Sequence, residues 1–278
     1  MGRRFVAAAL LLALVGGIVV AIALPLGWFG RHTSRAAPPT RLATVAGSGP
    51  RRVRGPHDSP VPILMYHVLA VARPDAAFPQ LFLTPSDFRA QMAWLSRHGY
   101  HAVTLRRVFR YWPSGIALPR KPVVLSFDDG YLSDYTIAFP VLRRHHRPGV
   151  LNLVVHNVRP GDITAREVRR LIRAGCEIDA HTISHADLTR LDPAAVRREV
   201  AGSRRQLRRM FGQRVDFFCY PLGHYNAAVV AAVRAAGYLG ATTEDEGLAQ
   251  PARRFTLPRL RLANGDGPAQ LAAKLART

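Results

Sequence analysis

The stretch Val123-Val124-Leu125-Ser126-Phe127-Asp128-Asp129-Gly130 decides the fold. Its first five residues are almost all apolar, which is typical of a strand buried on both faces of a parallel sheet. The strand then ends in two carboxylates and a glycine that lets the backbone turn sharply. Two adjacent carboxylates at a buried strand end need a nearby cation or raise one pKa, but Asp is also a common helix N-cap. The two aspartates could therefore belong to a chemical site, or one of them could cap the following helix.

Short apolar runs alternate with longer amphipathic runs from Val61 to Leu262. Repeated strand–helix units predict an α/β fold with a parallel sheet, and about seven or eight of them indicate a closed or nearly closed barrel. The strands are expected at 63–66, 122–127, 150–155, 176–180, 215–220 and 255–262, and the helices at 85–97, 131–145, 164–174, 193–211 and 227–236.

Polar residues follow several of these predicted strands, and parallel barrels carry their chemistry at the carboxyl ends of the strands. His181 and His185 follow one strand in the segment His-Thr-Ile-Ser-His. The i, i+4 spacing would place both imidazoles on one side of a helical turn, where they could bind one divalent ion. Two histidines with a carboxylate such as Asp129 would form an open metal site, although a histidine pair can also be incidental.

Three segments in this order resemble the leading motifs of the polysaccharide deacetylases, the NodB-homology or carbohydrate esterase 4 family. They are Ser-Phe-Asp-Asp-Gly (126–130), His-Thr-Ile-Ser-His (181–185) and Tyr-Pro-Leu-Gly (220–223), and the likeness extends from about Pro60 to Leu262. The resemblance implies a distorted (β/α)7 barrel. It also implies a hydrolase that removes acetyl groups from N-acetylated polysaccharides with the help of a metal ion.

Residue roles carried over from the family fall on the matching positions. The resemblance implies that Asp128 is the general base, that Leu222 offers its backbone N–H to the oxyanion, and that the rest of the third motif binds substrate. It further implies one divalent ion, with zinc as the first candidate and cobalt, nickel or manganese as alternatives. The implied metal ligands are Asp129, His181 and His185, and the implied substrate contacts are Tyr220, Pro221 and Gly223.

The sequence departs from the family pattern in two places. The arginine that tethers the base at the start of the third motif is missing, and Arg259 could replace it or lie on a solvated basic face. The Asp-Trp and carboxyl-terminal Leu-x-His motifs are also missing, so the general acid must come from elsewhere. His67 ends the first strand in Leu-Met-Tyr-His, as in the poly-N-acetylglucosamine deacetylase branch, where the acid occupies this position. We expect His67 to be protonated in the working complex, a form that nearby carboxylates would favour, unless it is a core histidine.

The amino terminus predicts export. Residues 1–30 contain an uncharged apolar run from Phe5 to Gly30, long enough to span a bilayer as a transmembrane signal anchor. A Pro- and Gly-rich flexible linker (31–60) and the deacetylase domain (61–278) follow, and we expect that domain outside the cytoplasm on a single-pass cell-membrane protein. Secretion after signal cleavage and a buried core helix are the alternatives.

Charge and cysteine content leave further alternatives. The formal net charge is +21. Lys121 and Lys274 are the only lysines among the 39 basic residues, so we attribute this arginine-rich composition to codon bias. We therefore expect no nucleic-acid partner. In an oxidising compartment Cys176 and Cys219 could form one disulfide. A glycan-binding barrel without turnover and a metal hydrolase of a small amide remain rivals to the deacetylase.

Overall fold

The computed structural model describes residues 51–53 and 55–276. In its main sheet all pairings are parallel, and β1 pairs with both β10 and β5, which closes the strands into a barrel. The short strand β4 (His101–Ala102) pairs with β5 beside the ring. The distorted (β/α)7 barrel is thereby confirmed. Around the ring the strands are β1 (Ile63–Tyr66), β10 (Leu257–Arg261), β9 (Gly240–Glu246), β8 (Phe217–Cys219), β7 (Glu177–Ala180), β6 (Val150–Leu153) and β5 (Pro122–Asp129).

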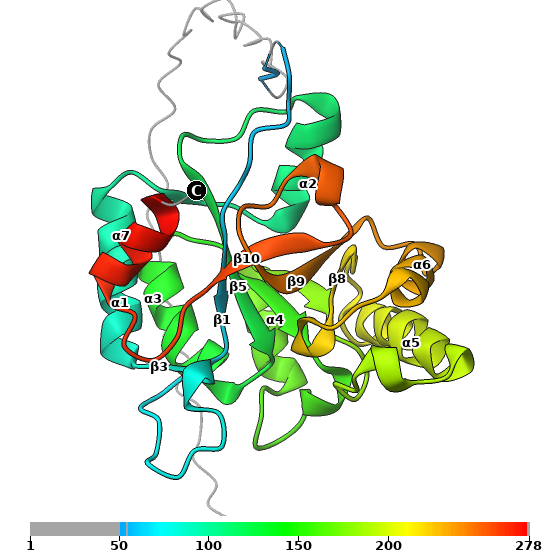
Figure 1. Ribbon diagram of the computed structural model, residues 1–278. Coiled ribbons are helices and arrows are strands. Elements are labelled where there is room, and N and C mark those ends of the chain that lie inside the picture. The colour runs from blue at the N-terminus through cyan, green and yellow to red at the C-terminus, as the bar shows by residue number, and fades with distance from the viewer. Residues whose placement is uncertain (1–50, 54, 277–278) are drawn as a thin grey trace, which may run out of the picture. The chain divides into compact units, whose positions relative to one another are not determined.

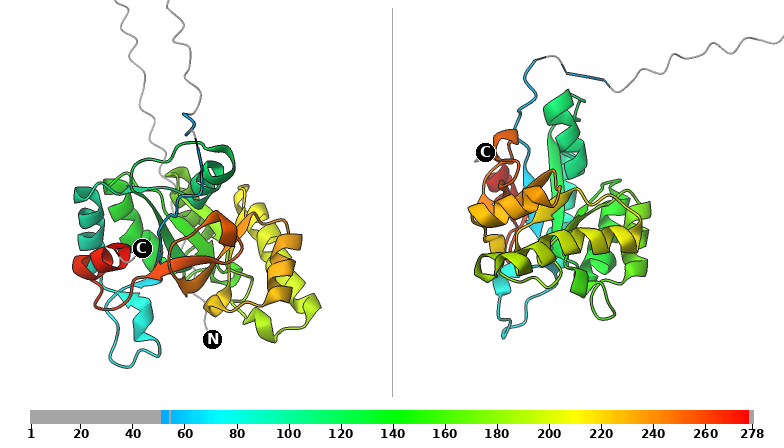
Figure 2. Two further views of the ribbon diagram at one scale, coloured as in Figure 1. Left: turned by 45° about the horizontal axis from the view of Figure 1, so that its top comes forward. Right: turned by 90° about the vertical axis from the view of Figure 1, so that its right-hand side faces the viewer.

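Helices lie around the outside of the strands (Figure 1, Figure 2). They are α1 (Pro85–Arg97), α2 (Leu105–Ser114), α3 (Phe139–Arg144), α4 (Ala165–Arg173), α5 (Pro193–Phe211), α6 (Ala227–Ala235) and α7 (Pro268–Ala276). Side-chain caps set their starts: Thr84 Oγ1 accepts the Asp87 N–H at the start of α1, and the Asp192 carboxylate accepts two N–H groups at the start of α5. Gly212, with a φ of 64°, ends α5 in the left-handed conformation.

The predicted helix 131–145 is interrupted. The structure has a π-helix, η2 (Asp134–Ala138), followed by α3. Pro140 lies at the start of α3 and has no backbone N–H to donate to the preceding turn, which explains why regular α-helical bonding does not run through this point. Strand β9 was not predicted, because its sequence Gly-Ala-Thr-Thr-Glu-Asp-Glu lacks an apolar run.

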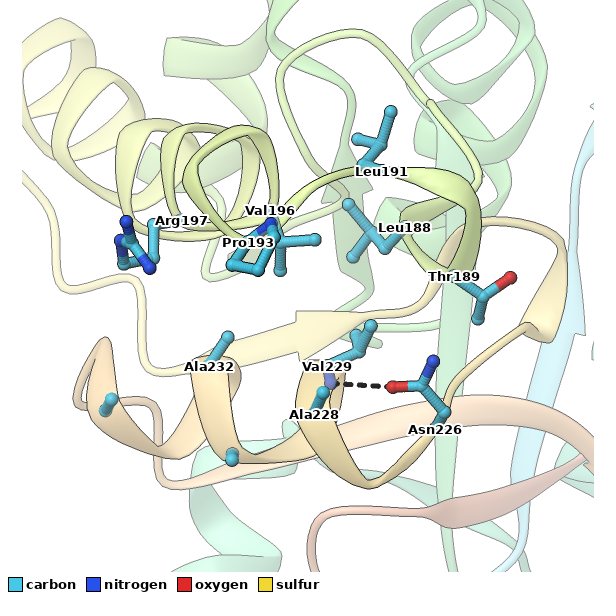
Figure 3. Close-up of a pocket in the computed structure, with 12 residues that line it drawn as sticks. Leu188, Thr189, Leu191, Pro193, Val196, Arg197, Asn226, Ala228, Val229 and Ala232 are labelled. Atoms are coloured by element: carbon cyan, nitrogen blue, oxygen red, sulfur yellow. Dashed lines mark hydrogen bonds between the residues drawn. The ribbon is translucent and has the colours of Figure 1, made fainter.

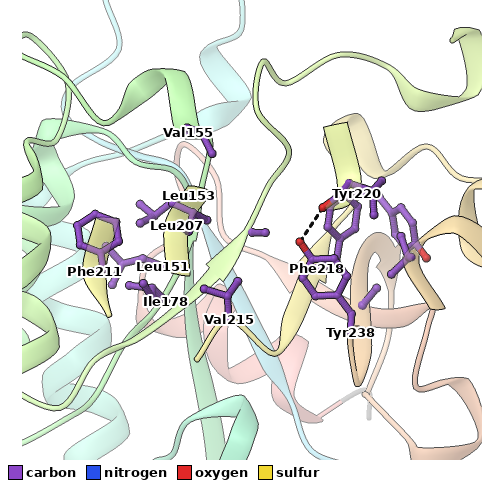
Figure 4. Packing of buried hydrophobic residues seen from close by; sticks show 14 of the residues in the cluster. Leu151, Leu153, Val155, Ile178, Leu207, Phe211, Val215, Phe218, Tyr220 and Tyr238 are labelled. Atoms are coloured by element: carbon purple, nitrogen blue, oxygen red, sulfur yellow. Dashed lines mark hydrogen bonds between the residues drawn. The ribbon is translucent and has the colours of Figure 1, made fainter. Parts of the chain in front are cut away.

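Apolar side chains fill the space between barrel and helices. The cluster in Figure 4 joins Leu151 and Leu153 of β6 to Leu207 of α5, with Phe218 of β8 and Tyr238 beside them. A second cluster packs β1 and β5 against α1, α3 and α7. These clusters hold the strand ends, and therefore the polar residues that follow them, at fixed positions.

Helix α2 covers the amino end of the barrel. Phe109 of α2 packs so closely on β9 that a Cβ atom at Gly240 would lie 2.4 Å from its ring. Residues 51–60, which the sequence placed in the linker, pack on the same helix: Arg52 pairs with Ile116 in an antiparallel bridge, and Trp112 Nε1 donates to the Ser59 carbonyl. The chain thus enters the fold at the end opposite the strand carboxyl ends (Figure 1).

The predicted anchor (1–30) lies outside the described residues. Among the helices of residues 51–53 and 55–276, none has the length and apolar character that a bilayer span requires.

Candidate active site

Asp128 lies near the carboxyl end of β5, inside the barrel, and accepts hydrogen bonds from Arg259 and Asn152. Its two oxygens each accept a hydrogen bond from the guanidinium of Arg259 on β10, both 2.8 Å long. Asn152 Nδ2 donates to Asp128 Oδ1 at 2.7 Å from the neighbouring strand β6, where the two residues are in register. Both members of the ion pair are almost wholly buried. Burial by itself raises the pKa of Asp128, but Arg259, with smaller contributions from His67 and His181, outweighs burial and holds that pKa far below its usual range.

Arg259 therefore does not lie on a solvated basic face. Its Nε donates to the Thr243 carbonyl of β9 at 2.7 Å, which fixes the guanidinium plane toward Asp128. The sequence singled out Arg259 as a candidate tether but missed Asn152. The sequence does contain an indication of the role of Asn152, because a lone amide in the apolar strand Val-Leu-Asn-Leu needs a buried hydrogen-bond partner.

His67 lies beside the same carboxylate. Its Nε2 is 3.8 Å from Asp128 Oδ2, and its Nδ1 is buried without a partner among the described residues. Desolvation lowers the pKa of His67 below the ordinary imidazole value, and this effect exceeds the opposing attraction of Asp128 and Asp129. In the free protein burial thus outweighs the carboxylates at this position, and the expectation that His67 is protonated in the working complex stays a prediction.

Asp129, His181 and His185 converge on one point. Asp129 Oδ1 lies 3.4 Å from Nε2 of each histidine, and the two Nε2 atoms are 3.1 Å apart. His181 Nδ1 is 2.8 Å from the Cys219 carbonyl, a contact that places the proton on Nδ1 and leaves Nε2 with a lone pair. Asp129 Oδ1 is buried and has no hydrogen-bond donor among the described residues. Two imidazole nitrogens and one carboxylate oxygen that lie within 4.8 Å of one another fit a divalent cation.

The histidine pair does not lie on a helical turn, as the spacing had suggested. Residues 181–187 form a loop in which Thr182 and His185 both have positive φ, at 67° and 63°. Glu199 of α5 holds this loop: its carboxylate accepts the N–H groups of Ile183 and Ser184 at 2.8 and 3.0 Å and the Ser184 hydroxyl at 2.8 Å. Sequence reasoning missed Glu199, which looks like an ordinary surface residue of an amphipathic helix.

The third motif forms a tight turn after β8. Leu222 has a φ of 57° and Gly223 a φ of 69°, and a Cβ atom at Gly223 would lie 2.6 Å from Glu244 Cβ, so only glycine fits there. The side chain of Leu222 is half exposed and faces the cleft. The turn does not bring Tyr220 or Pro221 into the cleft, because both are buried and the Tyr220 hydroxyl donates to the Phe255 carbonyl in the core.

A cavity of 540 Å³ opens over these groups. The segment between β2 (Val68–Leu69) and β3 (Phe82–Leu83) forms part of its rim. Arg261 of β10 lines another part and is paired with Glu244. Other residues that line it are Asp129, His185, Tyr131, Asn157, Leu222 and Phe78.

A second groove, of 340 Å³, lies between α5 and α6 (Figure 3). Its walls are formed by apolar side chains such as Val196, Val229 and Ala232, and its polar side chains are few and scattered. It contains no group of carboxylates, histidines or thiols, so the candidate active site is the cleft at the barrel mouth.

The two cysteines remain free thiols. Cys176 Sγ accepts the Gly149 N–H, whereas Cys219 Sγ lies 3.3 Å from the Arg259 guanidinium inside the barrel. The two side chains have different surroundings, and the possible disulfide between Cys176 and Cys219 is not formed. Cys219 also forms a second potential ligand group with Asp128 and His181, but Arg259 and Asn152 already occupy the oxygens of Asp128.

Comparisons with known proteins agree with this geometry. The protein YxkH of Bacillus subtilis is 28% identical over 207 residues, which cover 74% of this chain and 72% of that protein. The Escherichia coli K12 protein named poly-beta-1,6-N-acetyl-D-glucosamine N-deacetylase is 27% identical over 79% of this chain, but the match spans only 39% of that protein. The solved Streptococcus pyogenes deacetylase PplD in complex with acetate superposes with a TM-score of 0.73 at 25% identity, covering 78% of this chain and 98% of PplD.

The family profile described as polysaccharide deacetylase matches residues 115–241, which include β5 with Asp128 and Asp129, the histidine loop and the turn after β8. Residues 115–241 therefore carry a polysaccharide deacetylase family domain, consistent with these relatives and with the shared barrel.

Proposed function

We propose that the protein is a metal-dependent N-deacetylase that hydrolyses the acetamido groups of an N-acetylated extracellular or cell-wall polysaccharide. The observation that supports this most is the convergence of Asp129, His181 and His185 beside a buried acid–base pair, Asp128 and His67, in one cleft. A barrel that only bound glycans would not need both sets of groups.

Asp129, His181 and His185 are the residues that would hold the ion. Zinc is the first candidate because two imidazoles and one carboxylate are a common zinc ligand set, and cobalt, nickel and manganese accept the same donors. When bound, a divalent ion supplies Lewis acidity to the acetamide carbonyl.

Asp128 is proposed as the general base. Its ion pair with Arg259 keeps it ionised, so it can accept a proton from the attacking water while the guanidinium holds both carboxylate oxygens in place. The backbone N–H of Leu222 is proposed to stabilise the oxyanion from the turn after β8.

His67 is proposed as the general acid for the departing amine. Its Nε2 lies nearest Asp128 Oδ2, whereas Asn152 binds Oδ1, and its Nδ1 has no hydrogen-bond partner among the described residues. Because burial lowers its pKa in the free protein, the proton it donates must be taken up during the reaction, and the proton that Asp128 accepts from water is the nearest source.

The substrate is proposed to lie outside the cytoplasm. This location rests on the predicted anchor at residues 1–30, which would hold the domain at the outer side of the cell membrane. Among candidate polymers, the name of the E. coli relative makes poly-β-1,6-N-acetylglucosamine the first to test.

Acetate release tests the proposal. The full-length protein with zinc should release acetate from at least one polymer in a panel of poly-β-1,6-N-acetylglucosamine, peptidoglycan and chitin oligomers, and Asp128→Asn should abolish the release. Binding of a polymer without acetate release would favour the glycan-binding barrel, and release only from small acetamides would favour the small-amide hydrolase.

A further inference from the structure

The segment from Ala70 to Gln80, between β2 and β3, forms a wall of the catalytic cleft that the reaction scheme does not use. It projects at the carboxyl end of the barrel and is cyan in Figure 1. Two large apolar side chains on it are exposed, Val71 at 73% and Phe78 at 61%. Phe78 lines the cavity that contains Asp129 and His185, whereas Val71 does not.

The position of Phe78 is fixed by the base of this segment. Strands β2 and β3 pair in parallel, and Leu69 and Leu83 at their ends are buried in the core. The Leu69 N–H donates to Ser133 Oγ at 3.1 Å, which ties the segment to the chain that follows the Asp128–Asp129 pair. A turn in which the Leu81 N–H donates to the Phe78 carbonyl then sets the ring at the rim.

The cavity lining favours a sugar ring as the occupant at this rim. Apolar side chains (Phe78, Leu81) and hydrogen-bonding side chains (Gln80, Asn157) both line this wall. A pyranose has an apolar C–H face and polar hydroxyl edges, so it can pack on the Phe78 ring while its hydroxyls reach the Gln80 amide or the Asn157 amide oxygen. A lipid chain would offer no hydrogen bond to either group, and Asn157 Nδ2 already donates to the Asp129 carbonyl.

The sugar at Phe78 and the sugar that reacts lie at different depths in the cleft. Asp129 is 7% exposed at the bottom of the cleft, whereas Phe78 is 61% exposed at its mouth. A sugar whose acetamide reaches Asp129 fills the bottom of the cleft, so a ring that packs on Phe78 belongs to the next sugar of the chain.

We propose that Phe78 is a specificity-determining residue that binds the sugar adjacent to the one being deacetylated, so that the protein prefers oligosaccharides to monosaccharides. This inference rests on the proposed deacetylase function for the identity of the ligand.

The test compares chain lengths. With N-acetylglucosamine and its β-1,6-linked disaccharide and trisaccharide, the wild-type protein should show a lower KM for the longer substrates. Phe78→Ala should raise the KM for the trisaccharide about tenfold, equal to ~1.4 kcal/mol, with a much smaller effect on kcat, and should remove most of the preference for length. Phe78→Tyr should restore it because the ring is retained. Val71→Ala, an equally exposed apolar truncation on the same segment, should leave all three substrates unaffected.

Direct binding separates this inference from the deacetylase proposal. Calorimetric titration of the trisaccharide into Asp128→Asn protein, with and without Phe78→Ala, measures the contact without turnover. Phe78-dependent binding here, together with no acetate release by the wild-type protein with zinc from any polymer of the panel, would overturn the deacetylase and keep the sugar contact. Equal loss for monosaccharide and trisaccharide, no loss in Phe78→Ala, or no binding of any of the three sugars would overturn the sugar contact.

Discussion

The buried ion pair with Arg259 sets the protonation state of Asp128. A carboxylate taken out of water without a partner would become protonated, but the two short bonds from Arg259 keep it charged. The sequence could place Asp128 at a strand end, but it could not choose between a helix cap and a buried ion pair, because the partner lies 131 positions away on β10.

Removing both members of this pair should cost less than the sum of the two single losses. We expect Arg259→Gln and Asp128→Asn each to lower the free energy of unfolding by about 3–5 kcal/mol, since each leaves an uncompensated buried charge. The double variant should lose clearly less than the sum of the two, which chemical denaturation of all four proteins would measure. Additive losses would show that the two side chains are not coupled in solution.

A second prediction concerns His67. His67→Ala should keep its full metal content and lower kcat by about 10²–10⁴, the usual contribution of a positioned acid. Metal analysis and acetate release on the same preparation would check both points. Near-normal turnover would remove His67 from the chemistry, and loss of metal would make its role structural.

Among the elements of the fold, the histidine loop (residues 181–187) has a conformation that the sequence did not predict. The order of strands and most helix bounds followed from apolar periodicity and caps, and α5 starts and ends as predicted. The spacing of His181 and His185 suggested a helical turn, but the loop bends through Thr182 and His185 in left-handed conformations. Such a path depends on Glu199, a tertiary contact that local patterns do not encode.

The contact from Glu199 should matter for metal affinity. Glu199→Ala removes three hydrogen bonds that orient the loop, so zinc affinity should fall by roughly 10–100-fold with the ligands unchanged. Glu167→Ala is the matched control, because this glutamate caps α4 in the same manner but does not touch the loop. Competition titration with a zinc-binding dye would measure both, and equal affinities would contradict the assigned role.

For the whole molecule, stability should depend on pH through Asp134 in the π-helix. This carboxyl is fully buried, and neither oxygen has a partner among the described residues. Desolvation, with added repulsion from Asp129 and Asp128, raises its pKa well above the usual value. The folded state therefore retains a proton that the unfolded chain loses above pH ~4, and Asp134 lowers stability progressively as the pH rises from there toward its folded pKa.

Asp134→Asn should remove this dependence. Relative to the wild type, the variant should become more stable as pH rises from about 5 to 8, by at most ~1.4 kcal/mol per pH unit, the slope for one proton. Urea denaturation across this range would show it. A stability difference that does not change with pH would indicate that water or an unrecognised donor already satisfies the carboxylate.

The entry of the chain on α2 has a consequence for which molecules reach the cleft. Arg52 and Ser59 dock at the amino end of the barrel, so anything attached before Arg51 joins the domain on the side away from the catalytic mouth. The described part of residues 51–60 therefore leaves the cleft uncovered, and a long polymer could lie across the mouth without meeting this part of the chain.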